Sequence, residues 1–138
     1  MSTNAPTTSL ALERLRRLPQ RDDVFEVALI RMPAWITGEG VPPFRPMLSQ
    51  AVSRRADIVA DGQMLRPGEL GDHRPIEAVS KLAVHKAIGY RPTTVAVRDA
   101  ALLEGLRAEL APLDIEVRLE PALAALDHVV AAMTRSQT

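Results

Sequence analysis

The sequence predicts a single α/β domain in which one mixed sheet is built from three antiparallel strands followed by helix, strand, helix, strand and helix. Three observations predict this architecture. Apolar, β-branched runs come first, two later strand patterns at 93–97 and 115–119 alternate with helical patterns, and 138 residues suit one domain. Strands that alternate with helices of this length pair in parallel through right-handed crossovers.

The N-terminal segment is expected to contribute a tail and a short helix. Residues 1–8 are polar and lack periodicity, which predicts a disordered tail. An amphipathic helix is expected over 9–21, with Ser9 as its cap and Pro19 as its stop. Its apolar stripe needs a partner, either this chain's own sheet or a second copy of the chain. The stripe consists of Leu12, Leu15 and Leu18.

Three strands open the domain proper, which spans 22–135. The run 24–32 is apolar and β-branched and is closed by Pro33, so it predicts a buried first strand. Glycine and proline then indicate a loop at 37–43. The second strand, a turn and the third strand are expected at 47–53, 54–57 and 58–65. Within the third strand, Asp61-Gly62 is typical of either a hairpin turn or a bulge.

The second half alternates regularly. Pro75 suits the first position of a helix, and Gly89 suits the cap that ends it. After the strand at 93–97, Asp99 is placed to cap a helix with a leucine stripe. The strand at 115–119 follows, and Pro121 is expected to open the last helix.

Composition narrows the function classes. Lys plus Arg and Asp plus Glu both equal 17, so no global field attracts nucleic acid or an anionic membrane. The absence of cysteine excludes disulfides, thiolate metal sites and a cysteine nucleophile. No signal core and no membrane-length apolar run is apparent, so we expect a cytoplasmic protein.

The second half also resembles a known family. The segment 91–99 reads Arg-Pro-Thr-Thr-Val-Ala-Val-Arg-Asp, and it is followed by a leucine-rich helix, Leu113-Asp114-Ile115-Glu116-Val117 and Pro121-Ala122-Leu123. This pattern resembles an uncharacterised family of bacterial domains of unknown function, over roughly residues 24–133. That family often has Gly where this chain has Asp114. The element order is similar to the ribonuclease-H-like fold, and the family implies no settled activity.

Resemblance to ribonuclease-H-like enzymes implies a carboxylate cluster that holds two Mg²⁺ or Mn²⁺ ions. The acids in the corresponding elements are Glu26, Glu77, Asp99 and Asp127. Three of them also have a structural interpretation: Asp99 as a helix cap, Glu77 in a helix's first turn, and Asp127 on a solvated flank. Glu26 lies at the start of the expected strand, whose middle has no acid. We therefore expect no metal or cofactor.

Trp35, the only tryptophan, follows the first strand. It predicts either a plug at the end of the sheet or an anchor for a partner, with Phe44 on the same surface. We expect a non-catalytic module that binds protein. The partner we expect first is a second copy of this chain, in a homodimer. The alternatives are a metal-dependent nuclease, or nucleic-acid binding without cleavage. The candidate nucleic-acid contacts are Arg14, Arg16, Arg17, Arg54 and Arg55.

Overall fold

The computed structural model describes residues 6–31, 35–38, 40–45, 47–59, 63–65 and 75–137. In its first half the elements are α1 (Pro6–Arg17), β1 (Gln20–Arg31), β2 (Ile36–Gly38), β3 (Val41–Phe44), β4 (Met47–Ser53), β5 (Ile58–Val59) and β6 (Gln63–Leu65). In its second half they are α2 (Pro75–Val84), β7 (Arg91–Val97), α3 (Ala100–Leu110), the 3-10 helix η2 (Ala111–Leu113), β8 (Glu116–Leu119) and α4 (Ala124–Gln137).

One mixed sheet organises the molecule, as the alternating pattern predicts. Its strand order is β5-β4-β1-β7-β8, and β6 also pairs with β4. β1 runs antiparallel to β4 and parallel to β7, and β7 runs parallel to β8. β5 and β6 lie antiparallel to β4, along the edge that β1 leaves free. The predicted strands at 93–97 and 115–119 therefore do belong to the same sheet as the first strand.

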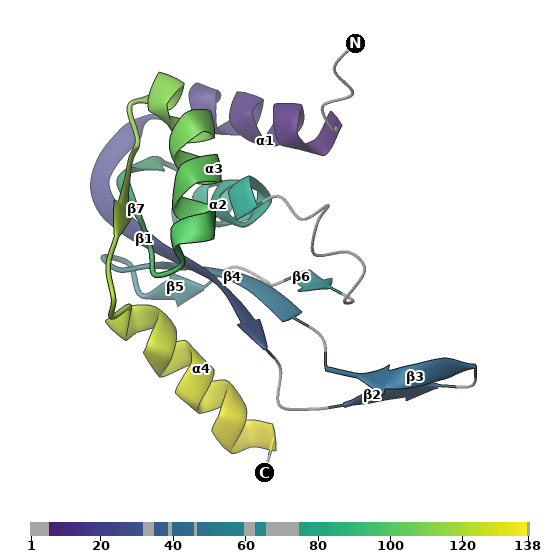
Figure 1. Cartoon of the computed structure of the whole chain (residues 1–138). Coiled ribbons are helices and arrows are strands. Elements are labelled where there is room, and N and C mark those ends of the chain that lie inside the picture. The colour runs from purple at the N-terminus through teal and green to yellow at the C-terminus, as the bar shows by residue number, and fades with distance from the viewer. Residues whose placement is uncertain are drawn as a thin grey trace.

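Helices cover both faces of this sheet, so there are two apolar cores (Figure 1). Alternate residues of β1 supply both: Phe25 and Val27 enter the core beneath α1, α2 and α3, while Ala28 and Ile30 enter the core beneath α4. Leu15 is fully buried in the first core, and α1 packs on α2. The leucine stripe of α1 thus packs against other elements of the same chain.

A two-stranded arm projects from the body of the molecule (Figure 1). β2 and β3 form this arm as a separate antiparallel sheet, joined through Gly40, whose φ is +73°. The prediction of a loop at 37–43 was wrong. Prolines cannot donate to a ladder, but two of them, Pro42 and Pro43, are accommodated in β3, which among the described residues pairs with β2 alone.

Several boundaries differ from the predictions. β1 begins at Gln20 instead of residue 24, so Glu26 is the seventh of its 12 residues and lies in its middle. α4 begins at Ala124, after Pro121. α1 begins at Pro6, so the predicted tail is too long and Ser9 lies inside the helix.

Two local features bear on the remaining predictions. β5 and β6 run in the same direction along β4, and Asp61-Gly62 between them lies outside the described residues. Asp114 adopts the left-handed conformation, with φ of +60°, just before β8. Glycine adopts this conformation without steric cost, which explains why Gly suits this position in the resembling family. Within the described part of the chain, no helix is long and apolar enough to span a membrane.

Candidate functional site

Two buried carboxylates stand on the central strand β1. Asp23 is 4% exposed and Glu26 is fully buried. They are three residues apart, so the alternation of a strand directs their side chains to opposite faces of the sheet. Buried acids are stable only when their oxygens accept hydrogen bonds or pair with cations. The hydrogen-bond partners of these two acids therefore indicate the role of each carboxylate.

Asp23 lies at the centre of a polar cluster on the α2 face. One carboxylate oxygen accepts hydrogen bonds from the backbone N–H of Val24 at 2.7 Å and of Arg55 at 2.9 Å. The other accepts from the hydroxyls of Ser53 and Tyr90, the latter at 2.8 Å. Burial raises the pKa of the Tyr90 hydroxyl, and its hydrogen bond to Asp23 raises this pKa further. Asp23 is thus fully satisfied by donors from β1, β4, the turn after β4 and the residue before β7.

Glu26 connects three elements on the α4 face. Its Oε2 accepts from Arg54 Nε at 2.8 Å, and its Oε1 accepts from the backbone N–H of Leu126 at 2.9 Å. The first hydrogen bond of α4 runs from Asp127 N to Leu123 O, so Leu123 occupies the cap position and has no side-chain acceptor. Glu26 supplies that acceptor instead. Its negative charge also suits the positive end of the helix dipole.

Arg54 extends this network to the surface. Its Nη2 donates to Glu120 Oε1 at 3.0 Å, while its Nε is held by Glu26. Burial alone lowers the pKa of Arg54, but hydrogen bonds to Glu26 and Glu120 outweigh burial and leave this pKa raised. The guanidinium remains positive and fixes the turn after β4 against the end of β8. This arrangement is typical of a structural ion-pair network.

The four acids implied by the nuclease resemblance lie in different surroundings. Asp99 accepts a hydrogen bond from Ala101 N at 2.9 Å and caps α3. Asp127 pairs with Arg98 at 2.7 Å. Glu77 lies on α2, on the face of the sheet opposite to α4 and Glu26 (Figure 1). Among the residues that the structure describes, no group of three or more His, Asp or Glu side chains could hold a metal ion.

The candidate nucleic-acid contacts lie on two elements: Arg14, Arg16 and Arg17 on α1, and Arg54 and Arg55 in the turn after β4. Arg54 is bound by two acids, and Arg16 and Arg17 both lie within 4 Å of Glu13 on α1. Arg55 donates to the backbone carbonyl of Asp22 at 3.1 Å. Arg14, on the same helix as Arg16 and Arg17, lines a pocket between α1 and α2. Most of these guanidinium groups thus contribute to contacts within the chain.

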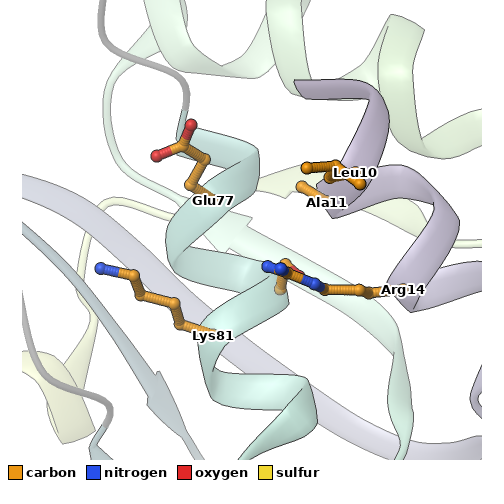
Figure 2. A pocket seen from close by; sticks show the side chains of 6 residues that line it. Leu10, Ala11, Arg14, Glu77 and Lys81 are labelled. Atoms are coloured by element: carbon orange, nitrogen blue, oxygen red, sulfur yellow. The ribbon is translucent and has the colours of Figure 1, made fainter. Parts of the chain in front are cut away.

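That pocket has a volume of about 210 Å³. It is lined by Leu10, Ala11, Arg14, Glu77, Ser80 and Lys81. Figure 2 shows Arg14 reaching from α1 toward α2, while the charged ends of Glu77 and Lys81 point away from α1. The charges therefore do not converge on one point. The buried Ser80 hydroxyl has no hydrogen-bond partner among the described residues.

Trp35 lies at the base of the arm and is 63% exposed. A plug at the end of the sheet would be buried, so of the two interpretations of this residue the plug is excluded. Phe44, paired with Ile36 across the arm, is half-buried. The base of the arm therefore presents the largest apolar side chain of the protein to solvent.

Sequence reasoning missed Asp23 and Tyr90. An acid in the run Arg21-Asp22-Asp23 resembles a turn, because charged residues are depleted from strand interiors. One of its hydrogen-bond donors, Tyr90, is 67 residues away. A tyrosine directly before the strand at 91–97 was the one available signal, since a buried Tyr hydroxyl needs a hydrogen-bond partner.

A family model covers most of the chain. The domain of unknown function named DUF6930 matches residues 11–134, from α1 to near the end of α4. No curated protein matches the chain. The match includes both buried carboxylates and the arm, and the chain therefore belongs to the family of domains of unknown function DUF6930.

Proposed function

We propose that this protein is a non-catalytic, self-associating protein-interaction module of ribonuclease-H-like fold. The sheet order supports this fold: three antiparallel strands, represented by β1, β4 and the β5–β6 edge, precede two parallel strands added on the other side of β1. The helices support it too, since α2 and α3 cover one face and α4 the other (Figure 1). Fold alone implies no activity.

The partners of the acids support a non-catalytic role. Both oxygens of Glu26 already accept hydrogen bonds, Asp99 caps α3, and Asp127 pairs with Arg98. A divalent metal would have to displace Arg54 from Glu26 and uncap a helix. These acids therefore have structural uses that account for their presence without catalysis.

The single observation that carries the proposal is the exposure of Trp35 at the base of the projecting arm. Tryptophan is enriched among the residues that dominate binding energy at protein interfaces. Because its side chain is 63% exposed, another molecule can contact this ring directly. The formal net charge is zero, so two copies of the chain approach each other without net repulsion. We therefore assign the arm to contact between copies.

Sedimentation over a range of protein concentrations tests this proposal. The wild-type mass should rise with concentration, and Trp35→Ala should reduce the association. Leu10→Ala is the matched control, because Leu10 is 53% exposed on α1, away from the arm. A wild-type protein that stays monomeric at every concentration, or a Trp35→Ala variant that associates as strongly as Leu10→Ala, contradicts the proposal.

One observation favours the nuclease alternative. Glu26 lies in the middle of the first strand, where the sequence-based boundary of that strand left no acid. Single-stranded, duplex and hybrid substrates should be assayed with Mg²⁺ and Mn²⁺. Metal-dependent cleavage that is lost in both Glu26→Gln and Asp99→Asn would support this alternative. We expect no cleavage.

A further inference from the structure

The outer edge of β8 has the features of a pairing surface. β8 ends the sheet, and among the described residues its strand partner is β7. Leu119 at its end is 49% exposed, one of the few large apolar side chains on the surface. An unpaired edge strand presents a row of free backbone donors and acceptors to another chain.

The hydrogen bonds to β7 determine which backbone groups are free. Glu120 N donates to Val97 O at 2.8 Å, so the backbone of Glu120 faces β7. Successive residues of a strand direct their backbone N–H and C=O groups to opposite sides. The backbone groups of Glu116 and Arg118 therefore also face β7, while those of Val117 and Leu119 face outward. The N–H of Ile115 already donates to Leu110 O at 3.3 Å, so its carbonyl is the group that can accept from another strand.

The side chains alternate with the same period. Glu116 and Arg118 share one face and are exposed, and they contact each other at 3.0 Å. Ile115, Val117 and Leu119 share the other face, where Ile115 and Val117 are buried and Leu119 is not. The edge therefore has one charged side and one apolar side.

We propose that β8 pairs antiparallel with β8 of a second copy about a two-fold axis at Val117. Val117 then lies opposite Val117 of the second copy, and the two exchange both backbone hydrogen bonds. Glu116 lies opposite Arg118 of the second copy, as a close pair without backbone hydrogen bonds, which favours side-chain contact. Leu119 lies opposite Ile115 of the second copy, so its exposed side chain gains an apolar neighbour.

Charge complementarity selects this register. Centring the axis on Arg118 would place Arg118 opposite itself and Glu116 opposite Glu120, and like charges directly opposite destabilise a sheet. Centring it on Val117 gives two Glu–Arg pairs related by symmetry. A symmetric dimer requires a patch that complements itself. An axis centred on Leu119 would also place Arg118 opposite Glu120, but it would place Val117 opposite Pro121, which has no N–H to donate to the ladder.

This inference rests on the proposed function only in that the partner is again a second copy. The surface is different: the arm projects on the side of the molecule away from the strand that leads into α4 (Figure 1). Both contacts can therefore form at once. The two are separated by working in the Trp35→Ala background, where the arm contributes little.

Amide hydrogen exchange in Trp35→Ala tests the pairing at the residue level. The N–H groups of Val117 and Leu119 face outward, so their exchange should slow as protein concentration rises. The N–H groups of Arg118 and Glu120 already face β7 and serve as internal controls, with little dependence on concentration. Exchange at Val117 and Leu119 that is independent of concentration up to the millimolar range overturns the proposal.

A charge swap tests the register. In the same background, Arg118→Glu places two acidic side chains opposite each other in each symmetry-related pair and should weaken the dimer about tenfold. The double variant Glu116→Arg/Arg118→Glu restores opposite charges and should return the dissociation constant to near that of the parent. Arg17→Glu makes the same charge change on α1, where the residue is exposed, and should have little effect. Equal weakening in the single and double variants contradicts this register.

Discussion

At the scale of single residues, the buried carboxylate of Glu26 connects parts of the chain that are far apart in sequence. It accepts from Arg54 after β4 and from Leu126, 100 residues away, at the start of α4. Removing one partner of a buried ion pair is strongly destabilising, because the remaining charged group is left desolvated and unpaired. The energetic role of Glu26 is therefore to hold α4 and the β4–β5 turn in place.

Glu26→Gln should lower the free energy of unfolding by about 1–3 kcal/mol, as measured by urea denaturation. The variant keeps an oxygen for Leu126 N but loses the charge that faces Arg54. The loss is reduced because the Arg54 side chain is 40% exposed and retains Glu120. Glu120→Gln, at a more exposed position, should cost less than about 1 kcal/mol. Equal costs for the two variants would contradict the role given to Glu26.

Tyr90 should make the stability depend on alkaline pH. The pKa of its hydroxyl is raised in the folded state above the ordinary value of 10.0. Above pH 10 the unfolded chain therefore loses this proton first, the folded chain binds more protons, and stability falls as pH rises. Below that pH the contribution is fully present. Tyr90→Phe should lose this pH dependence, and should cost about 1–2 kcal/mol at neutral pH through the hydrogen bond that Asp23 loses. An unchanged alkaline slope in Tyr90→Phe would be inconsistent with this assignment.

At the scale of elements, local signals explain what the sequence could predict. The second half of the chain was predicted well, because Pro75, Gly89 and Asp99 are start and stop signals that act within a few residues. α4 was predicted to begin too early because its cap comes from Glu26 on a distant strand. The start of β1 was missed for the same reason: Asp23 is compatible with a buried strand only because distant hydroxyls supply donors. Long-range partners leave no local pattern.

Asp99 provides a test at this scale. Asp99→Ala removes the acceptor for Ala101 N and should lower the free energy of unfolding by about 1 kcal/mol. Asp99→Asn keeps a side-chain oxygen at the cap and should be nearly neutral. Thermal or urea denaturation of both variants gives the comparison. Asparagine and alanine variants of equal stability would show that the cap contributes nothing.

At the scale of the whole molecule, we propose that two separate surfaces contact a second copy of the chain. Trp35 is exposed at the base of the arm, and the β8 edge presents the exposed side chain of Leu119 and the outward-facing backbone groups of the buried Val117. If both operate, wild-type assemblies should exceed a dimer at high concentration. Trp35→Ala should stop at dimers, and Trp35→Ala combined with Arg118→Glu should be largely monomeric. Sedimentation equilibrium of the three proteins distinguishes these states, and a double variant that assembles as far as wild type would exclude both surfaces.

The most direct test of self-association through the arm uses the fluorescence of Trp35, the only tryptophan in the chain. Its side chain is 63% exposed in the single chain, so acrylamide should quench it efficiently in dilute protein. As concentration rises, the emission should shift to the blue and quenching should weaken, because a second copy covers the ring. A quenching constant that stays the same from dilute to concentrated protein would show that no second copy covers Trp35.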